Sequence, residues 1–266
     1  MFRPRDSHDI SLIDTSISIS PTAEIHYYHD PFNNSITVAR FAESTSELRF
    51  DSSFRIEHYG KVISGYELEP YAQTYPFIYD NDELPDLMRS IERRYPDPGR
   101  QISNWARRFL DPSGKTDTHT LLASMNAAIK NDFLYVERYD QGVQDPLDTL
   151  RNGSGSCRDY ALFLMEAVRS LGLAARFVTG YLYDPSLDSD EPATVGGGST
   201  HAWVQICLPG VGWVEFDPTN GLIGGANLIR VAVVRDPSQA VPVRGVYTGS
   251  AKDFLGMSVE VNVTRE

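Results

Sequence analysis

The chain has 266 residues, 41% of them hydrophobic and 23% charged, and these proportions argue against both a disordered chain and a membrane protein. A formal net charge of −12 argues against a nucleic-acid partner, because a phosphate backbone is bound through clustered Lys and Arg side chains. No apolar run approaches the roughly 20 residues that cross a bilayer, and the first residues lack the basic segment and apolar stretch of a secretory signal. We therefore expect a cytoplasmic protein that binds neither nucleic acid nor membrane.

The only two cysteines, Cys157 and Cys207, lie in sequence contexts that share no pattern. A disulfide framework needs more cysteines at compact spacing, and a zinc site needs more ligands. His26, His29 and His58 lie in the first part of the chain, but nothing in their spacing makes them converge on a metal. We expect free thiols, no metal site and no other cofactor.

The length allows two structural units, since domains commonly hold about 100 to 150 residues. From residue 12 to about residue 79 the sequence is strand-like, with short alternating, aromatic or β-branched runs at 16–20, 24–28, 35–41, 47–50 and 54–59. Residues 30–34 (DPFNN) are typical of a turn between two of these runs. The pattern predicts a small antiparallel β-sandwich as an N-terminal domain, residues 1–80.

Helical patterns follow the strand-like region. One begins at Pro85, includes Tyr95 and ends at residues 96–99 (PDPG), a second short one covers 102–110, and a third has Thr118 as its expected N-cap. Their apolar residues recur at spacings of three and four, as in helices packed against a core. Together with the strands later in the chain, they predict an α+β domain over residues 81–266.

Cys157 lies at the start of another predicted helix. Residues 154–156 (SGS) are loop-like, and the apolar residues from 161 to 168 give a helical period that ends near Gly172. Aligned peptide dipoles and unpaired N–H groups at a helix start favour an anion, so they stabilise the thiolate over the thiol. The same N–H groups are placed where the oxyanion of an acyl-transfer intermediate would lie.

His201 and Asp217 suit the base and the orienting group that a thiolate nucleophile requires. Residues 174–183 and 200–208 are predicted strands, and a turn at 209–212 (PGVG) leads into a third strand that ends at Asp217. Two antiparallel strands joined by this turn bring His201, at the start of one, beside Asp217, at the end of the other. A helix packed on the sheet then brings Cys157 to His201.

Each of these residues also has a structural interpretation. A cysteine is often an inert buried residue, a single histidine is often structural, and an aspartate before proline is frequent in turns. The ordered set on a helix start, a strand start and a strand end favours the functional interpretation. Cys207 lies on the same strand as His201, some 20 Å away at about 3.3 Å per residue, and is predicted to be structural.

Four motifs then resemble one known family: GSCRD at 155–159, ARFVTGY at 175–181, HAWV at 201–204 and FDPTNG at 216–221. Over nearly its whole length the chain resembles the bacterial transglutaminase-like proteins, which are often described as cysteine proteases. The resemblance implies a papain-like, transglutaminase-like α+β core whose Cys-His-Asp triad corresponds to Cys157, His201 and Asp217. It also implies that the segment from Arg3 to about Tyr59 is the β-rich N-terminal region that accompanies this core in bacteria.

The sequence departs from the family pattern in two places. The family's N-terminal region usually begins with a further strand before the segment that resembles RPR at 3–5, so we expect this chain to start inside that region. An unpaired strand edge would invite dimerisation or swapping, which makes a homodimer through the β-rich domain one expectation. Residues 234–237 (VRDP) also differ, since the family more often has glycine before the arginine and an aromatic residue after the aspartate.

Two further residues are candidates around the site. Gln144 precedes the nucleophile, and its side-chain N–H is a candidate second oxyanion donor, as in papain-like enzymes, with a loop-stabilising role as the alternative. Trp203 is expected to shield the imidazole of His201 as a wall. The acidic, glycine-rich loop 184–199 either gates access, selects a cationic substrate or is a solvated connector.

The predicted activity is thiol-dependent acyl transfer on an amide bond. Water as the acceptor gives a protease or amidase, and a lysine amine gives an isopeptide cross-link; we favour hydrolysis because water is abundant. The alternatives are a transglutaminase, a non-catalytic binding module that retains the fold, and a metal-dependent hydrolase. The substrate stays open among a protein, a peptide, a peptidoglycan fragment and a small amide.

Overall fold

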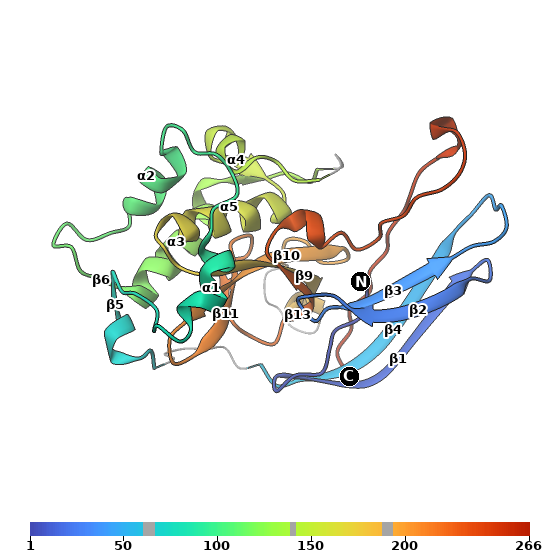
Figure 1. Cartoon of the computed structure of the whole chain (residues 1–266), viewed down its shortest axis with the longest axis horizontal. Helices are drawn as coiled ribbons and strands as arrows, with labels where there is room; N and C mark the ends of the chain where they lie inside the picture. The colour runs from blue at the N-terminus through green and yellow to red at the C-terminus, as the bar shows by residue number, and fades with distance from the viewer. Residues whose placement is uncertain (61–66, 139–141, 188–193) are drawn as a thin grey trace.

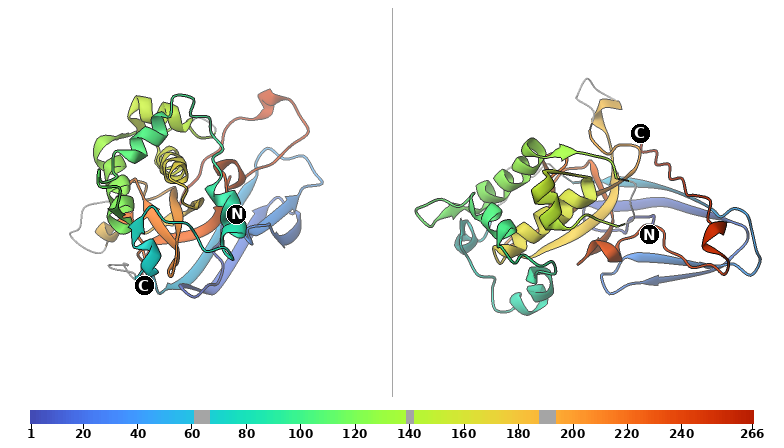
Figure 2. Two further views of the ribbon diagram at one scale, coloured as in Figure 1. Left: turned by 60° about the vertical axis from the view of Figure 1, so that its left-hand side comes forward. Right: turned by 90° about the horizontal axis from the view of Figure 1, so that it is seen from above.

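The computed structural model describes residues 1–60, 67–138, 142–187 and 194–266. A group of helices, a central five-stranded sheet and two ribbons of N-terminal strands lie side by side in that order (Figure 1). Views from two other directions place the ribbons on the side of the sheet away from the helices (Figure 2). Within the described ranges, no helix is both long and apolar enough to cross a membrane.

The N-terminal strands pair as two antiparallel ribbons. β1 (Ile10–Ser20) pairs with β4 (Arg49–His58), and β2 (Glu24–His29) pairs with β3 (Ser35–Arg40). Asn33 lies in the turn between β2 and β3 with a positive φ of 63°, a conformation that asparagine tolerates well. The predicted antiparallel strands are therefore present, although the runs at 47–50 and 54–59 form one continuous strand.

The two ribbons bury little apolar surface against each other. Every residue of β2 is exposed, and an open cleft of about 390 Å³ lies between the ribbons, lined in part by Phe2 and Tyr27. The ribbons are instead fastened to the central sheet, where the buried Asn34 donates to the Val233 carbonyl at 2.8 Å and accepts from its N–H at 2.9 Å. Because apolar burial is the main stabilising term in folding, these strands depend on the rest of the chain.

Helices and short strands occupy the middle of the chain. In chain order they are η1 (Pro70–Ala72), β5 (Thr74–Tyr75), α1 (Leu84–Ile91), α2 (Gln101–Arg107), β6 (Thr116–Asp117), α3 (Thr118–Asp132), β7 (Leu134–Tyr135), α4 (Pro146–Asn152) and β8 (Ser154–Gly155). β5 pairs with β6 in antiparallel fashion, whereas β7 and β8 form a parallel pair. The second pair lies directly before the nucleophile candidate.

Helix α1 is shorter than the sequence predicts: it ends at Ile91 and does not include Tyr95. Beyond it the chain turns toward the buried carboxylate of Glu166. That carboxylate accepts hydrogen bonds from the Arg93 side chain at 3.4 Å and from the Arg94 backbone N–H at 3.5 Å. A long-range partner therefore overrides the local helical pattern.

The N-cap of α3 is Asp117 and not Thr118, which corrects the prediction. The Asp117 carboxylate accepts a hydrogen bond from the backbone N–H of Thr120 at 2.7 Å. Thr118 is fully buried instead, and its hydroxyl donates to the backbone carbonyl of Ala72 at 2.6 Å. Both residues are good caps, so a contact distant in sequence decides between them.

The central sheet has the strand order β12-β11-β10-β9-β13, with all neighbours antiparallel. Its strands are β9 (Ala175–Leu182), β10 (Thr200–Leu208), β11 (Gly212–Asp217), β12 (Leu222–Ile223) and β13 (Leu228–Val234), and η2 (Pro185–Leu187) follows β9. β10 and β11 form the predicted hairpin, with Val204 opposite Phe216. The start of β10 thus meets the end of β11.

Helix α5 (Cys157–Ser170) is the centre of the core. All of its residues except Arg158 and Ser170 are buried, which is the pattern of a helix covered on every side. It packs against β9 and β10 on one side and against α2, α3 and α4 on the other. Gly172, with a φ of 81°, follows its end, as the sequence predicts.

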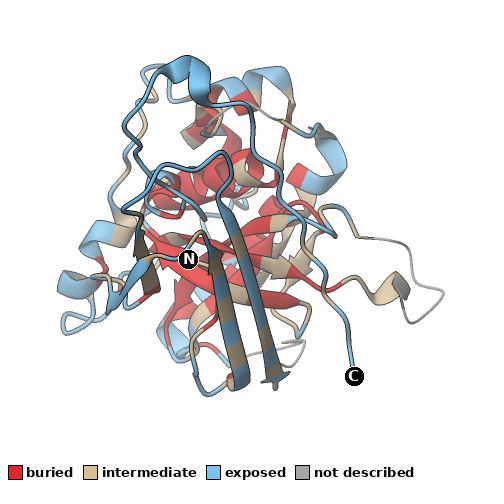
Figure 3. Cartoon of the chain, turned by 90° about the vertical axis from the view of Figure 1, so that its right-hand side faces the viewer, coloured by how far each residue is buried: buried red, intermediate tan, exposed pale blue. Residues whose placement is uncertain are grey.

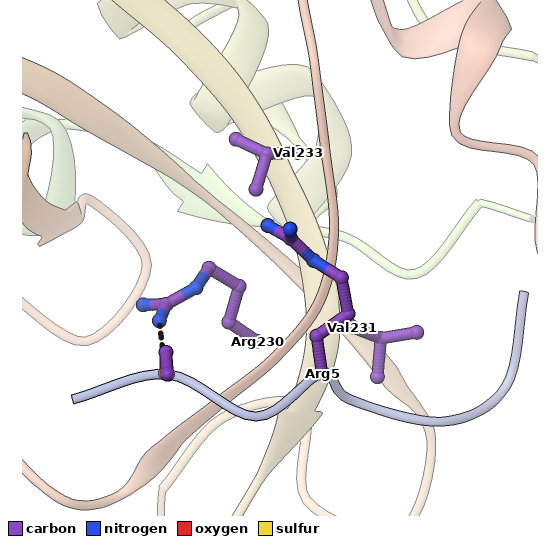
Figure 4. A pocket seen from close by; sticks show the side chains of 5 residues that line it. Arg5, Arg230, Val231 and Val233 are labelled. Atoms are coloured by element: carbon purple, nitrogen blue, oxygen red, sulfur yellow. Dashed lines mark hydrogen bonds between the residues drawn. The ribbon is translucent and has the colours of Figure 1, made fainter. Parts of the chain in front are cut away.

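Arg230 on β13 joins the N-terminal segment to the central sheet. Its guanidinium donates to Asp9 at 2.9 and 3.1 Å and to Glu215 of β11 at 2.9 Å. It lies beside Arg5, with a cavity of about 10 Å³ between them that is hardly larger than one water molecule (Figure 4). Burial raises the pKa of Glu215, which Arg230 opposes.

The last part of the chain contains η3 (Pro237–Gln239) and η4 (Ala251–Asp253) and is otherwise extended. It runs past the ribbons as a mostly exposed segment (Figure 3). Its contacts include a hydrogen bond of 3.0 Å from the Met1 ammonium to the Pro242 carbonyl and an ion pair of 3.9 Å between Glu266 and Arg55.

Candidate active site

A capping box formed by Ser156 and Asp159 sets the start of α5 at Cys157. The Asp159 carboxylate accepts hydrogen bonds from the backbone N–H and the hydroxyl of Ser156, at 2.8 and 2.9 Å. Ser156 has the extended backbone of an N-cap residue, with φ −88° and ψ 175°. Cys157 is therefore the first helical residue, as predicted, and it is 6% exposed.

Asp159 also holds the loop that precedes the nucleophile candidate. Its second oxygen accepts from the Arg138 guanidinium at 2.9 Å and from the backbone N–H of Gln144 at 2.6 Å. The carboxylate is completely buried. One side chain therefore fixes the helix start and the neighbouring loop relative to each other.

A hydrogen bond of 2.9 Å joins Nε2 of His201 to Oδ2 of Asp217, and both side chains are completely buried. The other oxygen of Asp217 accepts from the backbone N–H of Thr219 at 2.9 Å. Nδ1 of His201 has no nitrogen or oxygen partner within the described ranges, and the imidazole interacts with the thiol of Cys157. The structure thus brings the three predicted residues together and leaves Nδ1 for the sulfur.

The imidazole and the carboxylate are coupled electrostatically. Burial alone lowers the pKa of His201, but the charge and hydrogen bond of Asp217, with a smaller contribution from Cys157, raise it to about 10. Burial alone raises the pKa of Asp217. The imidazolium of His201 and the other hydrogen-bond donors to the carboxylate lower it by more, so the pKa lies below its ordinary value. At neutral pH the pair is therefore imidazolium and carboxylate.

Asn220 is a further residue of the site that the sequence interpretation missed. Its side-chain N–H groups donate to Oδ2 of Asp217 at 2.9 Å and to the Val195 carbonyl at 3.1 Å, and its Oδ1 accepts from the Val195 N–H at 2.9 Å. The available signal was its position in the FDPTNG motif, three residues after Asp217. Asn220 joins the carboxylate to the loop that precedes β10.

That loop covers the imidazole. A Cβ atom at Gly196 would lie 2.8 Å from Nδ1 of His201, and the residue has a φ of 92°, so glycine is required on both counts. The acidic residues Asp188, Asp190 and Glu191 of this loop, for which gating, substrate selection and a solvated connector are the alternatives, lie outside the described residues. The described part of the loop shields His201 from solvent.

The ring of Trp203 stacks on the imidazole of His201, with centroids 6.0 Å apart and planes inclined by 27°. Trp203 is completely buried. A Cβ atom at Gly180 would lie 2.8 Å from the indole and 2.0 Å from the Ile229 carbonyl oxygen, so a glycine makes room for both. This position suits the shielding wall that the sequence predicts.

The side chain of Gln144 is engaged with its own loop. Its amide nitrogen donates to the Thr149 hydroxyl and to the Ser154 carbonyl, both at 3.0 Å. A primary amide has two N–H groups, so neither is left for an oxyanion. The arrangement favours the loop-stabilising alternative over the oxyanion donor.

The second cysteine, Cys207 on β10, is 7% exposed and packs with Tyr79, Leu87 and Ala174. Burial raises the pKa of its thiol to about 11. Across the described part of the chain, no three His, Cys, Asp or Glu side chains gather as metal ligands would. Because it is buried among apolar side chains, Cys207 occupies a structural position, as predicted.

Two family models match the chain. The model of the transglutaminase-like superfamily matches residues 104–218, and that of the bacterial transglutaminase-like N-terminal region matches residues 1–57. The first range contains Cys157, His201 and Asp217, and the second contains β1 to β3 and nearly all of β4.

Similar proteins include relatives longer than this chain. An uncharacterized protein of Mycobacterium leprae is 37% identical over 115 residues, which are 43% of this chain and 40% of that protein. A protein-glutamine gamma-glutamyltransferase of Pseudomonas aeruginosa is 36% identical over 78 residues, which are 29% of this chain and 11% of that protein. The chain thus spans less than half the length of these relatives.

One solved structure is similar over most of its length. It belongs to a candidate cysteine protease of Cytophaga hutchinsonii, covers 90% of this chain and 76% of that chain, and has a TM-score of 0.67 at 18% identity. At this level of identity the likeness concerns the fold. The α+β core predicted from the sequence, accompanied by antiparallel N-terminal strands, is confirmed.

Proposed function

Because this chain belongs to the transglutaminase-like superfamily, with its bacterial N-terminal region, we propose that it is a thiol enzyme that transfers the acyl group of an amide. Cys157 is the nucleophile, His201 the acid and base, and Asp217 the group that orients the imidazole. The observation that carries this proposal is the buried hydrogen bond of 2.9 Å between His201 and Asp217, together with the interaction of the imidazole with the thiol of Cys157.

The reaction follows from the protonation states of the three groups. An imidazolium beside the sulfur favours the thiolate, which attacks the carbonyl carbon and moves the C=O electron pair onto oxygen. When that pair returns, the C–N bond breaks and His201 gives its proton to the departing amine. Water then attacks the thioester carbon while His201 takes its proton, and the C=O electron pair moves onto oxygen again. When that pair returns, the C–S bond breaks, the carboxylic acid leaves, and Cys157 and His201 are again thiolate and imidazolium.

Water is the acceptor that we favour, which makes the protein a cysteine protease or amidase. The second candidate is transamidation, in which an amine takes the place of water, and the similarity to the gamma-glutamyltransferase of Pseudomonas aeruginosa favours it. The two reactions share all three residues. Acetylating Cys157 with p-nitrophenyl acetate, then following acetate and acetyl-amine formation with and without a lysine-derived amine, separates them.

The two cysteines provide a matched test of the nucleophile, because they are 6% and 7% exposed. We expect iodoacetamide at neutral pH to alkylate Cys157 much faster than Cys207, as measured by mass spectrometry of the two peptides. His201→Ala should remove most of this difference, since it removes the imidazolium. Equal alkylation rates for the two cysteines in the unmodified protein would contradict the proposal.

Two other classes of function predict different results. A binding module that retains the fold would leave Cys157 unacetylated by p-nitrophenyl acetate. A metal-dependent hydrolase would lose activity to a chelator and keep it after alkylation. We expect the opposite pattern, with activity lost to iodoacetamide and retained in EDTA.

The localisation, the substrate class and the partners of the enzyme are also proposals. We place it in the cytoplasm, with a peptide, protein or small amide as substrate and with neither nucleic acid nor membrane as partner. Self-association through the N-terminal strands is supported by the outer edges of β1 and β4, which pair with no other described strand. Light scattering should then give the mass of a dimer, and a clean monomer would contradict it.

A further inference from the structure

The proposed reaction requires donors for the oxyanion, and the described residues supply one of them from the backbone. The N–H of Cys157 lies in the first turn of α5, where helical N–H groups have no partner within the helix. Oxyanion sites usually combine at least two donors. Gln144, the candidate for the second, has both of its side-chain N–H groups engaged with Thr149 and Ser154.

Tyr135 lies beside the start of α5 through the parallel pairing of β7 with β8. Its Cα is opposite Gly155, two residues before Cys157, and the N–H of Val136 donates to the Gly155 carbonyl at 2.9 Å. Side chains alternate between the two faces of a strand. Leu134 and Val136 are 69% and 42% exposed, so Tyr135, which is partly buried, points to the inner face.

On that inner face the Tyr135 ring meets the first turn of α5. It packs edge-on against Tyr160, with ring centroids 6.2 Å apart and an interplanar angle of 77°. Tyr160 is three residues after Cys157, and residues three apart share one face of a helix. The Tyr135 ring is therefore held over the helix face that carries the sulfur.

The phenol of Tyr135 is electrostatically coupled to the site and free to donate. Burial raises its pKa, and the neighbouring Cys157 and, more weakly, Asp217 raise it further, so the phenol keeps its proton at neutral pH. Among the hydrogen bonds of the described residues none involves the Tyr135 hydroxyl, although Tyr135 is close enough to Cys157 to interact with it. A neutral phenol beside the sulfur is a suitable donor for an oxygen that becomes negative.

We propose that Tyr135 is a catalytic residue whose hydroxyl, together with the N–H of Cys157, binds the oxyanion of the acyl-transfer intermediate. This inference rests on the proposed function. When the thiolate forms its bond to the carbonyl carbon, the C=O electron pair moves to oxygen and the phenol donates a hydrogen bond to it. The phenol keeps its proton throughout, and the pair returns to re-form C=O as the leaving group departs.

The test compares two reactions of the same sulfur. Acetylation of Cys157 by p-nitrophenyl acetate passes through an oxyanion, whereas alkylation by iodoacetamide is a direct displacement that forms none. We expect Tyr135→Phe, which keeps the ring, to slow acetylation about 10²-fold, the effect of removing one oxyanion donor. Alkylation should stay within about twofold of the unmodified protein. Mass spectrometry of the Cys157 peptide measures both rates.

Tyr160→Phe is the matched control, because it removes a hydroxyl from the ring in contact with Tyr135. The Tyr160 hydroxyl is buried without a close hydrogen-bond partner in the described part of the chain, so its loss should leave acetylation nearly unchanged. Gln144→Ala is the second comparison and should slow acetylation less than Tyr135→Phe. Circular dichroism spectra and melting curves establish that all three variants are folded.

The outcomes separate this inference from the proposed function. Acetylation at the full rate in Tyr135→Phe, with acetylation abolished in Cys157→Ala, overturns the role of Tyr135 and leaves the thiol enzyme intact. Equal losses of acetylation and alkylation in Tyr135→Phe also overturn it, because the phenol would then act on the thiol itself. A wild-type protein whose Cys157 is never acetylated overturns the proposed function, and the role of Tyr135 with it.

Discussion

Asp217 carries a charge in a completely buried position and is stabilised there by the donors around it. An unpaired buried charge costs several kcal/mol, so such a carboxylate persists only when its oxygens are occupied. His201, Asn220 and the Thr219 N–H supply donors at 2.9 Å each. The protonation state of His201 therefore depends on the carboxylate and on the residues that hold it.

The first prediction concerns the pH dependence of stability in Asp217→Asn. In the wild-type protein the pKa of His201 is raised to about 10, from about 6.5 in an unfolded chain. The interaction between the imidazolium and Asp217 therefore contributes its full free energy of stabilisation below about pH 6.5, and this contribution is lost as the pH rises toward 10. We expect the urea-unfolding free energy of the wild type to fall across this window and that of Asp217→Asn to fall much less. Parallel curves for the two proteins would contradict the assigned imidazolium.

The activity of Asp217→Asn should fall roughly 10³-fold or more, because an amide in place of the carboxylate holds the imidazole of His201 in the wrong tautomer. The measurement is the rate of Cys157 acetylation by p-nitrophenyl acetate at neutral pH. Far-UV circular dichroism distinguishes this loss from unfolding. A variant that is folded and fully active would remove Asp217 from the mechanism.

Asn220 offers a second prediction at this scale. Asn220→Ala leaves an oxygen of Asp217 and both backbone groups of Val195 without their side-chain partner. Each unsatisfied buried group costs about 1–3 kcal/mol, and we expect a total loss in that range because the exposed loop can relax toward water. Chemical denaturation measures it. Asn152→Ala, at an exposed position, is the control and should change stability by less than about 0.5 kcal/mol.

At the scale of the elements, the start of α5 depends on Asp159. Asp159→Ala removes the acceptor for Ser156, for the backbone of Gln144 and for Arg138. We expect a loss of about 3 kcal/mol, since a capping interaction and a buried ion pair disappear together. Asp132→Ala, whose ion pair with Arg108 is exposed, should change the denaturation midpoint little. A similar midpoint for the two variants would contradict the central role of Asp159.

The elements that sequence patterns predict correctly are those fixed by local rules. The hairpin of β10 and β11 follows from alternation around a glycine-containing turn, and α5 from its apolar period and the glycine after it. The predicted end of α1 and the predicted N-cap of α3 are wrong. Glu166 accepts a hydrogen bond from the backbone that follows α1, and the Ala72 carbonyl accepts one from Thr118, and both acceptors lie far away in the sequence. Likewise, no spacing rule reveals that both N–H groups of Gln144 are already engaged.

At the scale of the whole molecule, the ribbons and the core have different sources of stability. The core surrounds a buried helix, whereas the ribbons leave an open cleft between them and are fastened to β13 by polar contacts. The division of the chain at about residue 80 stays a prediction. These polar fastenings join residues some 200 positions apart, so local sequence patterns could not indicate them.

Arg230 provides a charged contact between the N-terminal segment and the sheet, because its guanidinium lies between Asp9 and Glu215. Arg230→Met keeps most of the side-chain volume and removes the charge, leaving the buried Glu215 without its ion-pair partner. We expect a loss of about 3 kcal/mol at neutral pH, the typical cost of breaking a buried pair. Arg55→Met, which removes an exposed pair with Glu266, is the matched control and should have little effect.

The pH dependence of that loss tests its cause. Burial already raises the pKa of Glu215, and removing Arg230 takes away the charge that opposes this rise. A carboxyl group whose folded pKa is raised is least costly when protonated, so the folded variant should regain stability relative to wild type as the pH falls from 7 toward about 5. Urea denaturation across this range, with Asp9→Asn alongside, separates the two partners of Arg230. A deficit that stays constant with pH would assign the loss to packing, and the link between the N-terminal segment and the sheet would then not depend on the charge of Glu215.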